Sequence, residues 1–232
     1  MLLIGFFLCL FNPFQYPAKA DCVLDFEYVF VDSGYSAKEA YEKLNISKEV
    51  DFALFHKAYI GFKNLKDRAI VKKDILTLID YGKSSTEKRL WIFDLKNFKV
   101  LENTWVAHGK NSGQDKAIHF SNKPNSLQSS LGFFLTKGTY YGKHGLSLRL
   151  EGLDSLYNSN AEKRAIVLHA ADYVSAAFIK LYGRLGRSFG CPAVSPKKSK
   201  RIIELIKDGS VIFAGDLKCP VESDICTIGS RE

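Results

Sequence analysis

Residues 183–194 read Gly-Arg-Leu-Gly-Arg-Ser-Phe-Gly-Cys-Pro-Ala-Val, which places Cys191 after a glycine-rich turn and directly before a proline. A histidine, His169, lies upstream at the end of the apolar run 165–168. A thiol becomes a strong nucleophile when a nearby imidazole accepts its proton or forms an ion pair with the thiolate. The two residues are therefore a candidate catalytic pair, since the partner of a catalytic cysteine is near it in the fold and not necessarily in the chain.

The residues next to Cys191 suit the same chemistry. Gly190 lets the backbone approach a substrate closely. The amides of Gly190 and Cys191 are candidate donors to the oxyanion that develops during acyl transfer, and Ser188 is a candidate to orient the histidine or bind substrate. The alternative is that Cys191 is a small buried apolar residue and His169 a hydrogen-bonded core histidine; composition and spacing leave both open.

At these residues the chain resembles a known family, the murein L,D-transpeptidases of the YkuD type. The signature of that family is a histidine followed, after a variable gap, by Ser-x-Gly-Cys, and here it reads His169, then 188–191. The resemblance is closest to the exported branch in which Pro-x-Val follows the cysteine, and it covers about residues 88–216. Supporting stretches are 106–109, 120–122, 129–132, 141–145 and 169–175.

The resemblance implies a mainly β YkuD-like L,D-transpeptidase catalytic domain; with the N-terminal segment that its own residue spacing predicts to be helical, the expected fold class is α+β. It also implies a thioacyl-enzyme mechanism without a cofactor, acting on peptidoglycan stem peptides. Cys191 would attack the carbonyl of the third residue of a stem tetrapeptide and expel the terminal D-Ala. His169 would act as general base and acid, Ser188 would support the histidine, and the backbone of Gly190 and Cys191 would form the oxyanion hole.

The chain departs from the better-known branch of the family at three positions around the motif: Phe189, Ala193 and Ala170 stand where His, Arg, and Gly or Ser are commoner. These departures put the substrate contacts in doubt rather than the chemistry. Tyr141 and His144, in a loop flanked by glycines, are expected to contact the carboxylates of the stem peptide; the alternative is a solvated hairpin tip.

The acceptor and the activity itself stay open from sequence alone. An amine from another stem would make the protein a transpeptidase, whereas water would make it an L,D-carboxypeptidase. A third interpretation, a non-catalytic cell-wall-binding module on the same scaffold, follows from the basic composition and the altered motif residues.

The first twenty residues predict a secretory signal. Residues 1–11 are nearly all apolar, and Ala18-Lys19-Ala20 fits a small-x-small cleavage site. The alternative is a retained anchor, but the run breaks at Asn12-Pro13, short of the roughly 20 residues that a bilayer span needs. After cleavage the chain would carry 32 basic and 25 acidic residues, a net charge of +7. We therefore expect an exported protein of the periplasm or cell envelope with an anionic partner other than nucleic acid, and no stable membrane span.

The whole chain of 232 residues is 46% hydrophobic, which permits a sizeable core. Beyond residue 20, changes in residue pattern divide it into three segments. Residues 21–87 are predicted to be a helical N-terminal segment of two or three helices, with a capping box at 36–39, an aromatic core stripe over 52–62 and helical spacing that continues through 71–81. Residues 88–216 are predicted to form the catalytic domain. In it strands are expected over 89–95, 99–107, 131–135, 146–150, 165–169 and 210–214, and helices over 173–181 and 196–207. Residues 217–232 form a short tail.

The spacing of the cysteines and histidines limits which disulfides and metal sites the chain can form. Cys219 and Cys226 lie close enough to close a small loop in an oxidising compartment, and Cys22 competes or stays unpaired; the sequence leaves this pairing open. No metal site is expected, because neither Cys-x-x-Cys nor His-Glu-x-x-His occurs. His108 and His119 flank a loop and are expected at the surface. The oligomeric state is left open.

Overall fold

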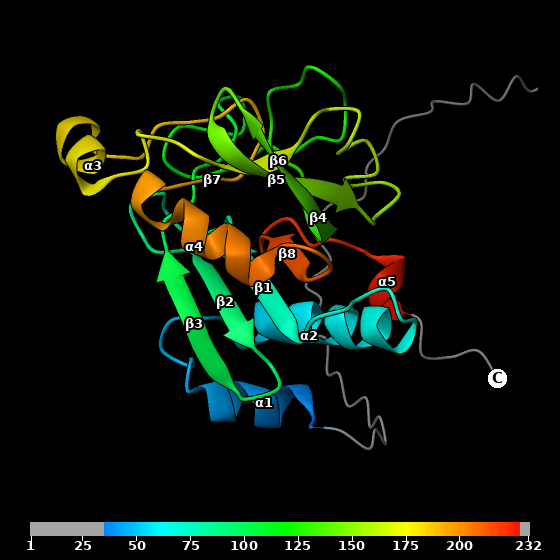
Figure 1. The fold of residues 1–232 in the computed structure, drawn as a ribbon. Helices are drawn as coiled ribbons and strands as arrows, with labels where there is room; N and C mark the ends of the chain where they lie inside the picture. Colours follow the sequence, from blue (N-terminus) through cyan, green and yellow to red (C-terminus); the bar gives the residue numbers. More distant parts are fainter. Residues whose placement is uncertain (1–34, 228–232) are drawn as a thin grey trace, which may run out of the picture. The chain divides into compact units, whose positions relative to one another are not determined.

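The computed structural model describes residues 35–227, and in this part eight strands form one mixed sheet (Figure 1). The strand order is β3-β2-β1-β8-β4-β5-β6-β7, in which β1 runs parallel to β8 and β6 parallel to β7, while the other neighbours are antiparallel. The predicted signal sequence at 1–20 and Cys22 lie outside the described residues.

The strands are β1 (Ile75–Asp80), β2 (Leu90–Asp94), β3 (Lys99–Thr104), β4 (Gly132–Gly142), β5 (Gly145–Gly152), β6 (Val167–Ala170), β7 (Ala193–Val194) and β8 (Val211–Gly215). The helices are α1 (Ala37–Leu44), α2 (Phe52–Asp67), α3 (Ala176–Tyr182), α4 (Pro196–Ile206) and α5 (Asp224–Thr227). The strands and helices predicted within 88–216 are all present, but β4 continues to Gly142, past its predicted end at 135, and the short strand β7 was not predicted.

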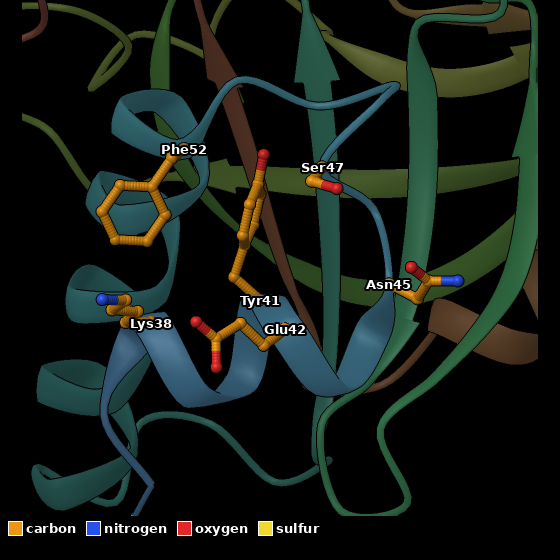
Figure 2. A pocket seen from close by; sticks show the side chains of 6 residues that line it. All are labelled: Lys38, Tyr41, Glu42, Asn45, Ser47 and Phe52. Carbon is orange, nitrogen blue, oxygen red and sulfur yellow. The ribbon is translucent and has the colours of Figure 1, made fainter.

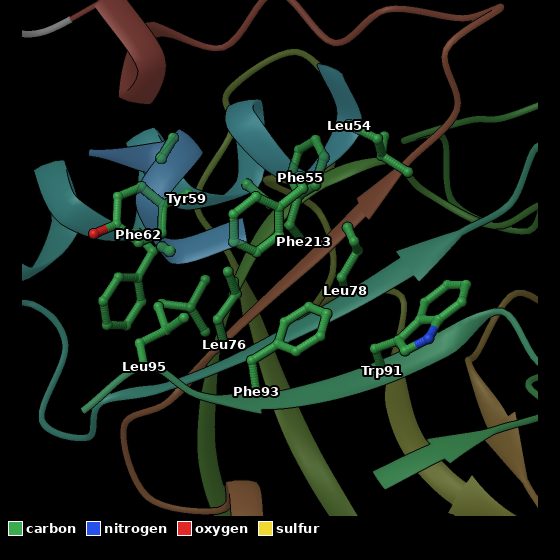
Figure 3. Close-up of a cluster of buried hydrophobic side chains, with 14 of the residues drawn as sticks. Leu54, Phe55, Tyr59, Phe62, Leu76, Leu78, Trp91, Phe93, Leu95 and Phe213 are labelled. Atoms are coloured by element: carbon green, nitrogen blue, oxygen red, sulfur yellow. The ribbon is translucent and has the colours of Figure 1, made fainter. Parts of the chain in front are cut away.

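The N-terminal helices cover one face of the sheet. The predicted capping box starts α1: the Glu39 N–H donates to Ser36 Oγ at 3.2 Å, and the Ser36 N–H donates to Glu39 Oε2 at 2.7 Å. The aromatic stripe of α2 faces the sheet, and its side chains are buried in one cluster with strand residues (Figure 3). The labelled members are Leu54, Phe55, Tyr59, Phe62, Leu76, Leu78, Trp91, Phe93, Leu95 and Phe213. The prediction that this stripe is core is confirmed for every member except Phe52, which is 41% exposed.

The second face packs against α4. Pro196 begins this helix, where its missing N–H costs no hydrogen bond. The helix turns Ile202, Ile203 and Ile206 inward, and it contacts β1, β5 and β6. Because β1 and β5 are separated in the strand order by β8 and β4, the sheet curves around α4 (Figure 1).

The helix predicted through 71–81 is wrong, because residues 75–80 form the strand β1. This strand lies between β2 and β8, and both of its faces are covered by apolar clusters. A strand buried on both faces is apolar at nearly every position, so its pattern does not alternate and cannot be separated from that of a buried helix. The α+β, mainly β fold class is confirmed, but the helical part of the predicted segment 21–87 ends before β1. Among the helices of residues 35–227, none is long and apolar enough to cross a bilayer.

Candidate active site

The two candidate catalytic residues lie on neighbouring strands at one end of the sheet. His169 is in β6, paired in register with Ala193 of β7, and its N–H donates to the Pro192 carbonyl at 3.3 Å. Cys191 lies two residues before Ala193 in the chain, so it is close to the start of β7. The parallel pairing of two very short strands therefore brings together residues that are distant in the chain.

Cys191 is the last residue of a tight turn formed by residues 188–191, the cysteine turn. Gly190 has φ +126°, and a Cβ atom there would lie 2.8 Å from the Gln128 carbonyl oxygen, so only glycine fits. Ser188 Oγ donates to the Cys191 carbonyl at 2.6 Å and accepts from the Gly190 N–H at 3.0 Å. Ser188 thus braces the turn, whereas we expected it to support the histidine.

These contacts change the expected oxyanion hole. The Gly190 N–H is already bonded to Ser188 Oγ. The hydrogen bonds of residues 35–227 include none donated by the Cys191 N–H. Of the two amides proposed from sequence, the one at Cys191 is the available donor for a developing oxyanion.

The sulfur of Cys191 lies against the segment that leads into β6. Its thiol donates to the Ala165 carbonyl at 3.6 Å, and the Val167 N–H donates to the sulfur at 3.5 Å. No hydrogen bond joins the sulfur to His169 among the residues that the structure describes. Burial raises the pKa of the Cys191 thiol, while the Val167 N–H and the Arg164 cation act the other way.

His169 is held in one tautomer by its own backbone neighbour. The ring Nδ1 lies 2.8 Å from the Ala170 carbonyl. A carbonyl only accepts, so Nδ1 carries the proton and Nε2 carries the lone pair. Burial lowers the pKa of His169; the hydrogen bond to the Ala170 carbonyl acts the other way, and the nearby His144 and Lys143 lower the pKa further. The imidazole is therefore neutral near pH 7 and able to act as a base through Nε2.

The β4–β5 hairpin tip reaches His169 through one of its two predicted substrate contacts. The ring of His144 stacks on the ring of His169, with centroids 4.3 Å apart and planes at 23°. Tyr141, by contrast, is 82% exposed on β4. The structure brings His144 to the site and leaves Tyr141 in solvent.

The buried Arg89 guanidinium supports the cysteine turn indirectly, through its contact with His108. Arg89 Nη2 lies 2.8 Å from His108 Nδ1, and its Nε and Nη2 donate to the Val106 carbonyl at 3.1 and 2.9 Å. The His108 carbonyl in turn accepts from the Ser188 N–H at 2.9 Å. His108 is fully buried, so its predicted surface position is wrong; His119 is exposed as expected.

The structure adds residues that the sequence did not single out. Arg164 places its guanidinium near the cysteine turn, and Tyr173 lies near enough for a Cys191 thiolate to raise the pKa of its phenol, on top of the larger effect of burial. The residues around each of them give no sign of a role at the site. Arg164 follows Glu162 and Lys163 in a stretch that reads as a solvated turn, and Tyr173 begins an expected helix. Proximity to Cys191 arises only in the fold.

Other groups lie away from this pair. Cys219 and Cys226, which the sequence left as one of several possible pairings, are free thiols. Within residues 35–227 no cluster of three His, Cys, Asp or Glu side chains is arranged to hold a metal ion. An open cavity of about 390 Å³ lies between α1 and the start of α2, lined by Lys38, Tyr41, Glu42, Asn45, Ser47 and Phe52 (Figure 2). It contains none of the candidate catalytic residues.

Comparison with known proteins gives one family. A family model described as the L,D-transpeptidase catalytic domain matches residues 46–214. This match starts upstream of residue 88, where the sequence resemblance was placed, and it includes β1. No curated protein sequence matches the chain.

Similar solved structures include an L,D-transpeptidase from Mycobacterium smegmatis, at 12% identity and a TM-score of 0.39, over 61% of this chain and 58% of that one. L,D-transpeptidase 1 from Mycobacterium tuberculosis is 13% identical with a TM-score of 0.34, over 60% of each chain. An L,D-transpeptidase from Stackebrandtia nassauensis is 15% identical with a TM-score of 0.35, over 82% of this chain and 84% of that one. The match spans less than two thirds of the length of both mycobacterial proteins.

Proposed function

The chain belongs to the L,D-transpeptidase catalytic domain family, and on this premise we propose that it forms a thioacyl-enzyme on Cys191 from a peptidoglycan stem tetrapeptide and transfers the acyl group to an amine. The observation that carries the proposal is the arrangement around the sulfur. Cys191 Sγ lies between the Ala165 carbonyl and the Val167 N–H, at the start of the strand that carries His169.

The first half-reaction makes a thioester. His169 Nε2 accepts the thiol proton as Cys191 Sγ bonds to the carbonyl carbon of the third stem residue, and the negative charge on the carbonyl oxygen faces the Cys191 N–H. The bond to the terminal D-Ala then breaks, and the leaving amine takes the proton from His169. The products are the thioester and free D-Ala.

The second half-reaction resolves the thioester. An acceptor amine loses a proton to His169 Nε2 as its nitrogen bonds to the carbonyl carbon. The carbon–sulfur bond breaks, and the proton returns to the Cys191 sulfur. A new amide cross-link forms and the free thiol is regenerated. Water in place of the amine would give a tripeptide, the carboxypeptidase outcome.

The proposal includes export to the periplasm or cell envelope. It is supported by the apolar run at 1–11 and the Ala18-Lys19-Ala20 site, and by the location of peptidoglycan itself. The net charge of +7 that the chain would carry after cleavage suits an anionic wall polymer.

A carbapenem tests the nucleophile, because a thiolate opens its strained lactam and remains acylated. Incubation of the chain from residue 21 onward with a carbapenem should add the mass of one drug molecule. Cys191→Ala should show no adduct, whereas Cys219→Ala, which removes an exposed thiol, should be labelled like wild type. Absence of labelling on wild type, or equal labelling of Cys191→Ala, would contradict the proposal.

A second assay identifies the acceptor. Stem tetrapeptide alone and with an amine acceptor is incubated with the protein, and the products are separated by mass. Release of D-Ala with a cross-linked dimer identifies a transpeptidase, and release with tripeptide only identifies a carboxypeptidase. Normal binding to sacculi by Cys191→Ala together with no product from wild type would identify a wall-binding module instead.

A further inference from the structure

Arg164 makes an unusual number of contacts for a residue in a surface turn. Its Nη1 donates to the Ser121 carbonyl at 2.5 Å and to Ser130 Oγ. Its Nη2 donates to the Gln128 carbonyl at 2.6 Å and to Ser126 Oγ at 3.1 Å. One guanidinium thus holds four points of the irregular loop 121–130.

The same guanidinium reaches the cysteine turn. A Cβ atom on Gly190 would lie 3.3 Å from Arg164 Nη2 and 2.8 Å from the Gln128 oxygen that this nitrogen binds. Ser129, in the same loop, donates to the Gly190 carbonyl at 3.4 Å. Arg164 therefore lies between the loop and the turn that presents the sulfur.

The charge of Arg164 acts on that sulfur. Burial raises the pKa of the Cys191 thiol, and the Arg164 cation acts against that effect. Burial lowers the pKa of Arg164, and a Cys191 thiolate acts against that effect in return. Two residues after the cysteine, where the better-known branch of the family usually carries Arg, this chain has Ala193. The cation nearest to Gly190 comes instead from the turn before β6.

We propose that Arg164 is a positioning residue, which fastens the loop 121–130 to the cysteine turn and stabilises the thiolate that forms at Cys191. The proposal rests on the proposed function for its biological meaning. The hydrogen bonds that Arg164 donates to the loop and the effect of its charge on Cys191 can both be measured on the protein without substrate.

The two parts can be separated by substitution. Lysine keeps the charge but has a single nitrogen, so Arg164→Lys loses the planar fork that spans the loop. Glutamine keeps polarity but loses the charge, so Arg164→Gln loses both. Lys163→Gln is the matched control, because it removes the neighbouring cation from an exposed side chain.

The experiment measures alkylation of Cys191 by iodoacetamide from about pH 7 to about pH 11, because burial raises the pKa of this thiol, and it is read by mass spectrometry of the peptide that contains residue 191. Arg164→Gln should raise the pH midpoint by about one unit and slow alkylation at pH 7 about tenfold. Arg164→Lys should keep a midpoint close to wild type but lose hydrogen-exchange protection at the amides of 121–130. Lys163→Gln should match wild type in both readouts.

Each outcome decides something. An unchanged midpoint in Arg164→Gln overturns the electrostatic part, and unchanged protection in Arg164→Lys overturns the positioning part. If Arg164→Gln does not fold, Arg164→Lys alone decides. A midpoint about one unit above wild type in this variant, which keeps the cation, overturns the proposal. Unchanged hydrogen-exchange protection at the amides of 121–130 overturns it as well. Alkylation of wild-type Cys191 without any carbapenem adduct or D-Ala release would refute the proposed function while leaving the Arg164 measurement intact.

Discussion

Cys191 and His169 are both neutral before substrate binds, and for the same physical reason. Burial disfavours the charged form of each group, which raises the pKa of the thiol and lowers the pKa of the imidazole. In the free protein the thiol donates to the Ala165 carbonyl. In the proposed reaction the proton therefore moves from Sγ to Nε2 as the bond to the substrate forms, by general-base catalysis and not from a preformed ion pair.

Thr77 is a residue whose environment predicts a gain in stability. It is fully buried in β1, its register neighbours Ile92 and Ile212 are apolar, and its hydroxyl is without a hydrogen-bond partner in the described part of the chain. Thr77→Val replaces this hydroxyl with a methyl group of similar size. We expect the free energy of unfolding, measured by urea denaturation, to rise by about 1 kcal/mol.

Thr136 is the matched control, because it is equally buried but its hydroxyl is bonded. It donates to the Ile206 carbonyl at 2.6 Å and accepts from the Ser210 N–H at 2.9 Å. Thr136→Val should lower the free energy of unfolding by roughly 1–3 kcal/mol, since its partners are left unpaired. A similar loss in both variants would show that the hydroxyl of Thr77 is not a source of instability.

At the scale of elements, one short segment supplies most of the site. The turn before β6 gives Arg164 and the Ala165 carbonyl, and the strand gives the Val167 N–H and His169. Ala165 has φ +52°, a left-handed conformation that is uncommon for a residue with a side chain. This bend turns the chain from the Arg164 side of the sulfur into the strand that carries the base.

The contact between α2 and the sheet depends on a glycine in the middle of the helix. A Cβ atom on Gly61 would lie 2.0 Å from Phe133 Cζ. The Phe133 ring is itself packed against Phe213, with centroids 4.5 Å apart, so it cannot easily move. Gly61→Ala gains about 1 kcal/mol of helix propensity but should still lower the free energy of unfolding by roughly 1–2 kcal/mol net.

Gly138→Ala is the control for that measurement, because a Cβ atom there would meet nothing within 4 Å. Both variants are compared with wild type by chemical denaturation. Gly138→Ala should change stability little. If Gly61→Ala were as stable as wild type or more so, helix propensity would outweigh packing, and the tight approach of α2 would not be needed.

At the scale of the whole described fold, Arg89 and His108 link the sheet to the loops around the site. Arg89 donates to the Lys83 and Val106 carbonyls and contacts His108, which supports Ser188 through its carbonyl. Burial, together with the adjacent Arg89 cation, lowers the pKa of His108 to about 3. His108 is therefore a neutral acceptor for a buried cation in the folded protein.

This network predicts a loss of stability in acid. In the unfolded chain the pKa of a histidine is about 6.5, so between about pH 6.5 and pH 3 the unfolded state binds a proton that the folded state does not. The free energy of unfolding should therefore fall as the pH falls through this range, by about 1.4 kcal/mol per pH unit from His108. His108→Gln keeps an acceptor for Arg89 but cannot titrate, so its stability should fall less steeply from pH 6 to 4.

Urea denaturation at several pH values measures both slopes. Asp80 and Asp154 act in the opposite direction, because burial raises the pKa of each, so the difference between variants is the quantity to compare. His119→Gln removes an exposed histidine and should keep the wild-type slope. Equal slopes in His108→Gln and wild type would mean that His108 is not the source of the acid sensitivity.

Much of the site could be predicted because its signals are local. The turn at Ser188–Cys191, the histidine after an apolar run and the capping box at Ser36 each depend on residues close together in the chain. Local geometry and hydrogen bonding determine such features whatever the rest of the fold does. The alternation and turn signals of residues 88–216 likewise predicted the order of strands and helices there, except for the two-residue strand β7.

The sequence by itself thus determined the candidate nucleophile and base, the family resemblance and the mainly β class. The tertiary structure alone decided that residues 75–80 are a central strand, that Ser188 braces the cysteine turn, that the Ala170 carbonyl orients His169, and that Arg164 reaches Gly190. The physical reason is that burial and hydrogen-bond partners are properties of neighbours in space. A strand covered on both faces and an arginine bonded to a distant loop look, residue by residue, like a helix and a solvated turn.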